Sequence, residues 1–436
     1  MADRDDDRPM DVKRRQLLVG LTALTACPFA AGAAHAESAK GNVTAAPDTT
    51  ASPNDQINPF GRYQAGVTTT RPANGLIASF AVVGKGMDEI EALFQKLTER
   101  ISHLTSGSTI EPSDPKLPPP DSGILGSVLR PDALTITISL GASFFDDRPD
   151  FTDLKPKHLV KMMRFPNDAP DSAIMHGDLT LQICANSQDT NLHALRDIIK
   201  NLSKFMILKW KQEGNVPVVA PSADGTVESA RNFLGFKDGS ANPDASDTSL
   251  MDSIIWVGPD NGEPNWCHGG SYQAVRIIRN FVERWDRTPL GEQEAIIGRS
   301  RISGAPLDAL EASEFQPPDF ANDPEGKLTP LDAHIRLSNP RDKGSEKNLI
   351  LRRPFNYSNG VTKSGQLDQG LLFICYQADL TQGFITVQRR LDGEPLEEYI
   401  KPVGGGFYFT LPGCPSSSDY FGHSLVKAAR DKATRL

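Results

Sequence analysis

Hydrophobic positions in the first half of the chain follow two different periods. Strands are predicted where apolar residues run together or alternate with polar ones, at 76–83, 133–141, 178–186 and 216–220. Amphipathic helices are predicted where apolar residues recur three and four positions apart, at 87–104 and 191–210. The resulting order, β-α-β-β-α-β, is that of a ferredoxin-like unit.

The same order can be followed a second time in the C-terminal half. Predicted strands are 253–257, 349–358, 370–377 and 405–411, and predicted helices are 271–285 and 380–391. The helix at 271–285 is predicted because one helical face would carry Tyr272, Val275, Ile278, Val282 and Trp285. We therefore predict an α+β fold of two ferredoxin-like modules, each an antiparallel sheet with peripheral helices. A long insertion at about 287–348 is typical of a functional segment.

The first 58 residues differ in composition from the rest. A basic patch with adjacent Arg14 and Arg15 precedes an apolar run and Ala34-His35-Ala36, which is typical of a twin-arginine export signal. The predicted parts are a signal peptide at 1–36, a flexible linker at 37–58, an N-terminal domain at 59–222 and a C-terminal domain at 223–436. An uncleaved anchor helix, a lipoprotein-type cleavage box at 24–27 and a start at Met10 stay open as alternatives. Export by this route, to the periplasm, carries folded proteins and often a cofactor.

Charge and cysteine content exclude some classes of protein. The net charge of −9 argues against a broad nucleic-acid-binding surface, so no nucleic-acid partner is expected. The cysteines beyond the signal show no CxxC spacing, which predicts neither a zinc site nor a disulfide scaffold. A single disulfide among them is left open. These cysteines are Cys184, Cys267, Cys375 and Cys414.

Two residues stand out as candidate chemistry. Asp238 lies in the glycine-rich stretch FLGFKDGSANP, where it is either the former of an Asx-turn or a carboxylate that moves protons in an apolar pocket. His334 lies in the insertion, close to Arg336 and Arg341. The histidines show no HxxxH or HxH spacing, so a two-histidine metal site is not indicated. From the residues alone, a bound cofactor stays open.

Five separated motifs carry a resemblance to a known family. They are GFKDGSANP (235–243), GGSYQAVRIIRN (269–280), LDAHIRLSNPR (331–341), LILRRPFNYS (349–358) and GLLFICYQADL (370–380). In this order they resemble the dye-decolourising (DyP-type) haem peroxidases, and within them the exported deferrochelatase/peroxidase branch called EfeB-type. The resemblance covers about residues 60–430.

The resemblance implies a function and partners. It implies one haem b per chain, held in the C-terminal domain, with hydrogen peroxide reduced and bulky organic or dye-type reductants oxidised in one-electron steps. The alternative is a deferrochelatase that releases iron from haem and leaves protoporphyrin intact, beside components of an iron-uptake permease. Family members often form dimers or larger assemblies, so a homodimer is part of the expectation. The physiological reductant stays open.

The resemblance also implies roles for individual residues. His334 matches the axial ligand of the haem iron, and Glu398, with Glu397 as its rival, is expected to orient the His334 ring. Asp238 matches the distal acid that transfers protons of peroxide, and Arg352 the distal arginine that stabilises developing negative charge. The haem-contacting positions implied are Gly239, Ser240, Ala241, Asn339, Pro340, Arg341, Arg352, Leu371 and Phe373. Arg276 and Arg279 are either propionate partners or part of a solvated helix face.

Overall fold

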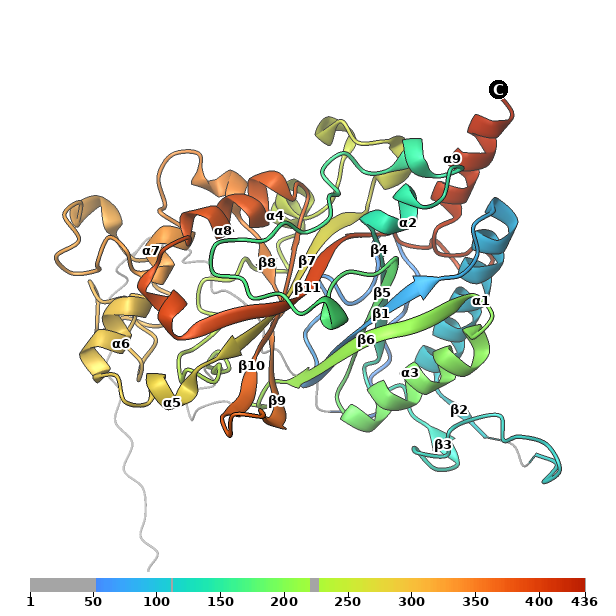
Figure 1. Cartoon of the computed structure of the whole chain (residues 1–436), viewed down its shortest axis with the longest axis horizontal. Coiled ribbons are helices and arrows are strands. Elements are labelled where there is room, and N and C mark those ends of the chain that lie inside the picture. The colour runs from blue at the N-terminus through green and yellow to red at the C-terminus, as the bar shows by residue number, and fades with distance from the viewer. Residues whose placement is uncertain (1–51, 111–112, 220–226, 436) are drawn as a thin grey trace, which may run out of the picture. The chain divides into compact units, whose positions relative to one another are not determined.

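The computed structural model describes residues 52–110, 113–219 and 227–435 (Figure 1). The predicted signal peptide, most of the predicted linker and the predicted boundary at 222/223 lie outside these ranges. The end of the linker is not free, since the backbone N–H groups of Asp132 and Ala133 donate to the carbonyls of Pro53 and Asp55. The last residues of the predicted linker therefore contact the N-terminal domain, and its flexibility stays a prediction. Within the ranges described, no helix has the length and apolar character needed to cross a membrane.

The N-terminal half contains a four-stranded antiparallel sheet in the order β4-β5-β1-β6. Its strands are β1 (Asn74–Val82), β4 (Thr135–Gly141), β5 (Leu179–Ala185) and β6 (Met206–Asn215). Its connections contain α1 (Met87–Ser106), the short strands β2 (Ser108–Thr109) and β3 (Val128–Leu129), α2 (Ala142–Asp146) and α3 (Gln188–Leu202). The predicted ferredoxin-like order is confirmed here.

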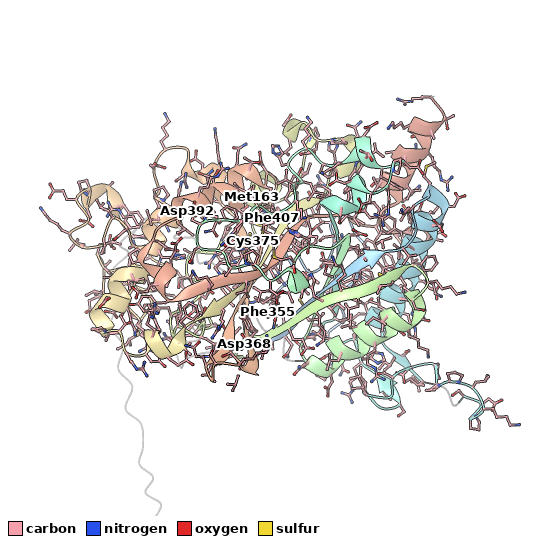
Figure 2. The ribbon with its side chains drawn as sticks, viewed as in Figure 1. Met163, Phe355, Asp368, Cys375, Asp392 and Phe407 are labelled. Carbon is pink, nitrogen blue, oxygen red and sulfur yellow. The ribbon has the colours of Figure 1, made fainter. Side chains whose placement is uncertain are left out.

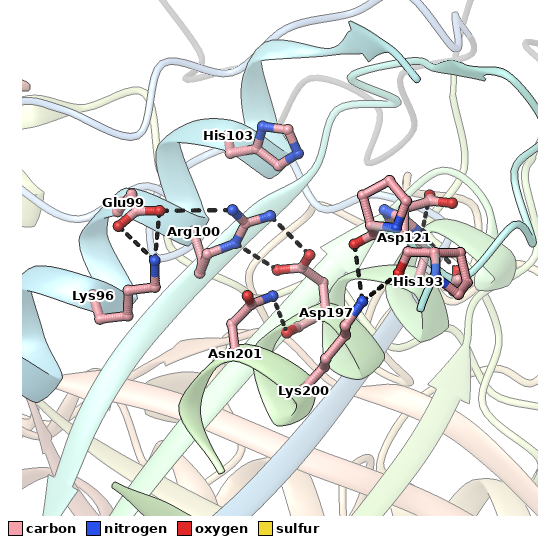
Figure 3. Close-up of polar contacts among 12 residues, drawn as sticks. Lys96, Glu99, Arg100, His103, Asp121, His193, Asp197, Lys200 and Asn201 are labelled. Carbon is pink, nitrogen blue, oxygen red and sulfur yellow. Dashed lines mark hydrogen bonds and ion pairs between the residues drawn. The ribbon is translucent and has the colours of Figure 1, made fainter. Parts of the chain in front are cut away.

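Helices α1 and α3 lie side by side and cover this sheet. The apolar stripe of α1 is fully buried and consists of Ile90, Leu93, Phe94, Leu97 and Ile101. Figure 3 shows the polar contacts at the helix pair, where Arg100 donates from Nε and Nη2 to the two carboxylate oxygens of Asp197, both at 2.8 Å. Such a bidentate pair fixes one helix against the other in addition to the apolar packing.

The last strand of this half was predicted at the wrong place. The helix predicted over 191–210 ends at Leu202, and residues 206–210 begin β6, while 216–219 form no strand. No glycine or proline separates α3 from β6, and Met206 and Trp210 are buried apolar residues that continue a helical spacing. The sequence pattern therefore did not indicate where the helix ends.

The C-terminal half repeats the strand order as β9-β10-β7-β11. Its strands are β7 (Ser271–Asn280), β8 (Leu351–Arg352), β9 (Phe355–Val361), β10 (Leu367–Gln377) and β11 (Ile400–Thr410). Its helices are α4 (Thr248–Ile254), α5 (Val282–Trp285), α6 (Leu290–Ile297), α7 (His334–Ser338), the π-helical turn Thr381–Ile385 with α8 (Thr386–Arg390), and α9 (His423–Ala433). Short 3-10 helices cover Thr152–Leu154, Ser172–Ile174, Pro259–Asn261, Asn265–Cys267, Phe320–Asn322, Ser345–Asn348 and Pro395–Glu398. The predicted two-module fold class is confirmed.

Two elements of this half were predicted with the wrong type. The helix predicted at 271–285 is strand β7 over most of its length, and the strand predicted at 253–257 is the end of α4 followed by irregular chain. Strand β7 pairs with β10 on one side and β11 on the other, and both of its faces are buried for most of its length. A strand buried on both faces lacks alternation, so its apolar residues also match a helical period.

The two sheets continue into each other. Strand β11 pairs with β4 over Tyr408–Thr410, and β6 meets β9 at the pair Asn215 and Asn356. Because β7 also pairs with β10, the strand pairings form a closed series. The predicted strand 349–358 is interrupted at Pro354, which separates β8 from β9.

Candidate active site

A cavity of about 270 Å³ lies in the C-terminal half and collects most of the predicted site residues. His334 comes from α7, Asp238 from the loop at 235–243, Arg352 from β8, and Leu371 and Phe373 from β10. The cavity is also lined by the predicted positions Gly239, Ser240, Ala241, Asn339 and Arg341. Pro340 is not among the lining residues, so the structure does not bring that prediction to the cavity wall.

His334 is the first residue of α7 and is held by a buried carboxylate. Its Nδ1 donates to Oε2 of Glu394 at 2.7 Å, and the Glu394 side chain is 3 % exposed. Burial alone would lower the pKa of His334, but the charge and hydrogen bond of Glu394 outweigh it and raise that pKa. With Nδ1 engaged, the other ring nitrogen is left for a ligand in the cavity.

The prediction of Glu398 as the partner of His334 is wrong, and so is that of its rival Glu397. Glu398 is exposed and pairs with Arg284 at 3.2 Å, and Glu397 accepts from the backbone N–H of Gly393 at 3.1 Å. Glu397 still lines the cavity and Glu398 faces solvent, while Glu394, directly before the 3-10 helix Pro395–Glu398, is buried and reaches His334. The family resemblance pointed to Glu398 and Glu397, and no sequence pattern pointed to Glu394.

Asp238 and Arg352 form an ion pair at the cavity. Arg352 Nη1 donates to Oδ1 of Asp238 at 2.5 Å, although the two residues are 114 positions apart. Asn242, four residues after the acid, accepts from the Arg352 N–H at 2.9 Å and donates to the Arg352 carbonyl at 3.0 Å. One loop therefore carries the acid and also fixes the strand that carries its partner. The carboxylate faces a distant arginine, so an Asx-turn does not describe its role.

Glu314, in the insertion, anchors the same loop and was not predicted from the sequence. Its buried carboxylate accepts from Lys237 Nζ at 3.1 Å, Ser240 Oγ at 2.7 Å and the Ser229 N–H at 3.0 Å. Burial alone would raise the pKa of Glu314, but the hydrogen bonds from Ser240 and Ser229 outweigh it and lower that pKa. The contacts at Lys237 and Ser240 flank Asp238 on both sides, which restricts the backbone that presents this acid.

Close packing explains one glycine of the motif. A Cβ placed on Gly239 would lie 2.8 Å from Oγ of Ser229, which is closer than real Cβ contacts allow. The N–H of Asp238, the preceding residue, donates to the carbonyl of Ala230 at 2.9 Å. The loop thus packs directly on residues 229–230, and a side chain at position 239 would require the Ser229 side chain to move.

Arginines give the cavity a positive field. Arg299 is buried, and its pKa is lowered to about 10 by burial first and then by the charge of Arg341, with a smaller contribution from Arg352. The three guanidinium groups are therefore close enough to repel one another, which favours an anionic ligand.

Arg276 and Arg279 lie on opposite faces of β7, because side chains alternate along a strand. Arg276 is 1 % exposed, lines the cavity and forms an ion pair with Asp168. Arg279 instead donates to Gln366 at 3.0 Å. The solvated helix face considered for both is therefore wrong, and Arg276 alone reaches the cavity.

A second, smaller cavity of about 170 Å³ also reaches the ion pair. It is lined by Asp238, Gly239 and Arg352 together with hydroxyl-bearing residues such as Thr69 and Ser246. The carboxylate and the guanidinium are thus accessible to a small polar molecule that does not have to pass through the larger cavity.

The fold and the site agree with the family comparisons. Residues 64–215 match the family model described as Dyp-type peroxidase, N-terminal, and residues 229–415 match the one described as Dyp-type peroxidase, C-terminal. This chain belongs to the Dyp-type peroxidase family and is an enzyme of the peroxidase class. The resemblance of the five sequence motifs is thereby confirmed.

Curated relatives carry a more particular name. The deferrochelatase of Escherichia coli K12 is 50 % identical over 431 residues, covering 98 % of this chain and all of the relative. The deferrochelatase of Shigella flexneri is 49 % identical over 429 residues with the same coverage. Among solved structures, ferric DtpA from Streptomyces lividans has a TM-score of 0.75 and 32 % identity, covering 86 % of this chain and 98 % of that one. The DyP-type peroxidase from Cellulomonas bogoriensis has a TM-score of 0.75 and 30 % identity, covering 86 % of this chain and all of that one.

Proposed function

We propose that this chain is a haem-dependent peroxidase that reduces hydrogen peroxide at Asp238 and Arg352 and oxidises organic reductants in one-electron steps. The observation that carries the proposal is one cavity lined both by the Asp238–Arg352 pair and by the His334–Glu394 pair. A proton-transfer group and a candidate iron ligand thus line the same cavity.

The residues of the cavity fit one haem b. Haem is a planar apolar macrocycle with two carboxylates, and the cavity combines apolar side chains such as Leu371 and Phe373 with Arg299 and Arg341. His334 would hold the iron through the ring nitrogen that Glu394 leaves unengaged. When bound, the haem supplies the redox chemistry, and the chain supplies binding, orientation and electrostatics.

Proton transfer is the task of Asp238. Its carboxylate accepts a proton from one oxygen of peroxide and returns it to the other oxygen, which leaves as water. Arg352 keeps a positive charge beside the oxygen on which negative charge develops. Asn242 fixes the backbone of Arg352, so the two groups keep their mutual geometry during the reaction.

Spectroscopy of the purified haem-containing protein tests this proposal. Mixing with hydrogen peroxide is expected to change the Soret band within seconds and to restore it when an organic reductant is added. The Asp238→Asn variant is expected to bind haem normally and to show the first change far more slowly. A haem-loaded protein whose Soret band does not respond to peroxide contradicts the proposal.

A second candidate function is the release of iron from haem with the porphyrin left intact. It is supported by the relatives named deferrochelatase, which are about half identical to this chain over nearly its whole length. Incubation of the protein with haem and an iron chelator distinguishes the two. Free protoporphyrin IX among the products supports iron release, and haem recovered unchanged contradicts it.

Export to the periplasm by the twin-arginine route is a further part of the proposal. It is supported by the Arg14-Arg15 pattern ahead of an apolar run. Replacing both arginines by lysine is expected to leave the protein in the cytoplasmic fraction, and unchanged export contradicts this route. A homodimer and contact with iron-uptake permease components belong to the same proposal, and they are tested by light scattering and by co-purification from the membrane fraction.

A further inference from the structure

A third cavity, of about 520 Å³, lies outside the site described above. It is bounded by α2, the loop at 161–170, the segment after the 3-10 helix Ser172–Ile174, β6 and β11. The largest apolar side chains that line it are three methionines and one aromatic ring, namely Met162, Met163, Met175 and Phe407. Met163 and Phe407 are labelled next to each other in Figure 2, where the loop at 161–170 passes over β11.

The polar side chains of this cavity carry excess positive charge. Lys161, Arg164 and Lys209 line it, and Arg164 donates from Nε to the carbonyl of Asp168 at 3.2 Å. Within the described ranges neither lysine side chain has a hydrogen bond or ion pair. The two acids that line it are already engaged, since Asp146 pairs with Lys155 at 2.7 Å and Asp168 with Arg276. The free charge of the cavity is therefore cationic.

His176 lines the third cavity together with the two lysines and has a strained backbone conformation. Its φ is 56°, a left-handed value uncommon for histidine, and the backbone is held there by three hydrogen bonds. The His176 N–H donates to Gly405, and its carbonyl accepts from Ser79 Oγ at 2.8 Å and Trp210 Nε1 at 2.7 Å. Burial and then the charges of Lys161 and Lys209 lower the pKa of His176 to about 4. The imidazole is therefore neutral at neutral pH, and the two lysines are close to it.

The third cavity and the proposed haem cavity share a thin wall. Phe407 lines the third cavity and contacts Phe384, which lines the haem cavity, with ring centroids 5.6 Å apart. Asp168 lines the third cavity, and its ion-pair partner Arg276 lines the haem cavity. A molecule in the third cavity thus lies two packed side chains away from the haem cavity.

We propose that the third cavity binds a planar aromatic anion, with its carboxylate or sulfonate at Lys161 and Lys209, as an organic reductant of this enzyme. The role as reductant rests on the proposed peroxidase function. A metal cation does not fit, because the two lysines repel it, and a small inorganic ion does not use the apolar lining. Methionine thioethers make favourable contacts with aromatic rings, which selects an aromatic body for the ligand. Two ligand molecules each lose one electron for every hydrogen peroxide that takes up two protons and becomes two waters.

Calorimetric titration of the haem-containing protein without peroxide tests the binding site. The probe is 2-naphthalenesulfonate, and 2-naphthol is the matched neutral probe with the same ring system. We expect Lys161→Gln/Lys209→Gln to weaken sulfonate binding about tenfold or more, since two charge-assisted contacts are removed, and to leave 2-naphthol binding unchanged. The control is Lys116→Gln/Lys363→Gln, which removes the same charge from exposed positions that line none of the cavities named here. Equal sulfonate binding by the two double variants overturns the proposal.

Steady-state kinetics separate this proposal from the peroxidase proposal. With a disulfonated donor, Lys161→Gln/Lys209→Gln is expected to raise KM for the donor about tenfold, with kcat/KM for hydrogen peroxide unchanged. If this variant reacts normally with peroxide and its KM for the donor is unchanged, the proposed anion site is overturned and the peroxidase proposal is not. Sulfonate binding that depends on the lysines, in a protein whose Soret band ignores peroxide, overturns the peroxidase function and the reductant role, while it supports the anion site.

Discussion

The two halves of the sheet share one strand order but differ in what covers them. In the N-terminal half, β1 leads to β4 through α1, of 20 residues, and β5 leads to β6 through α3, of 15 residues. In the C-terminal half, β7 leads to β9 through residues 281–350, which contain only short helices, and β10 leads to β11 through the π-helical turn and α8.

Because of this difference in the connections, the N-terminal half has a filled hydrophobic core and the C-terminal half has a cavity. Long amphipathic helices fill the N-terminal half with apolar side chains, whereas the corresponding face of β7 and β10 lines a cavity. Arg276 and Phe373 are paired across these strands, as are Ile278 and Leu371, and all four reach the cavity. The same sheet thus packs as a core where a long helix covers it and provides a binding site where short segments surround it.

The largest expected effect comes from replacing one histidine by alanine in each half and comparing the two variants. His334→Ala is expected to abolish haem retention and peroxidase activity, measured by the Soret absorbance per protein and by turnover. His193→Ala, in α3, removes a buried ring whose Nδ1 lies 2.8 Å from Ser122 Oγ, and should cost about 1–3 kcal/mol of stability with haem and activity unchanged. Full haem binding by His334→Ala would show that the cavity is not organised around this residue.

Asp238→Asn tests the acid of the cavity in the same way. We expect the rate of the peroxide reaction to fall by a hundredfold to about ten-thousandfold, the range typical of a positioned proton-transfer group, with the haem content of the protein unchanged. Asp197→Asn, which weakens the α1–α3 ion pair, is expected to lower stability only. Stopped-flow absorbance measures the rate, and an Asp238→Asn rate within threefold of wild type contradicts the assignment.

Leu425→Ala tests whether the hydrophobic core of the N-terminal half depends on helix α9. Leu425 lies on α9, is fully buried and belongs to the core formed by α1 and α3. Its truncation is expected to cost about 2–5 kcal/mol of unfolding free energy in denaturant, with the peroxide rate unchanged at 25 °C. The control is Leu310→Ala, at a leucine that is 57 % exposed. Equal stability of the two variants contradicts the packing described.

Glu314→Gln gives the smallest expected effect and adds a pH dependence. Because hydrogen bonds lower the pKa of Glu314 in the folded state, its carboxylate contributes stability above its unfolded pKa of about 4.3 and loses that contribution as the pH falls. At pH 7 the variant should be about 1–3 kcal/mol less stable than wild type. The difference should shrink as the pH is lowered from 5 towards 3 in denaturant titrations. A difference independent of pH contradicts ionisation as its cause.

The sequence predicted what local pattern determines. Strands β4 and β5 and helix α1 were found because one period dominates each of them, and β1 was found from its short continuous apolar run. The boundary at Met206 and the type of β7 were missed, since both depend on which strands pair, and pairing is not local. In the site, the motif residues His334, Asp238 and Arg352 were correctly brought together. Glu394 and Glu314 were missed because the burial of each acid and its hydrogen bonds depend on residues far away in the sequence.

The pairing of β11 with β4, together with the place of α9, has a consequence for how the protein is made. The core over the first sheet contains Phe421, Leu425 and Val426, and β4 has β11 as its second neighbour. A ribosome synthesises these residues after the whole first half, so that half leaves the ribosome with part of its apolar surface still uncovered. Completion of this core is therefore expected only once β11 and residues 421–426 have emerged, and until then the first half is the part most in need of a chaperone.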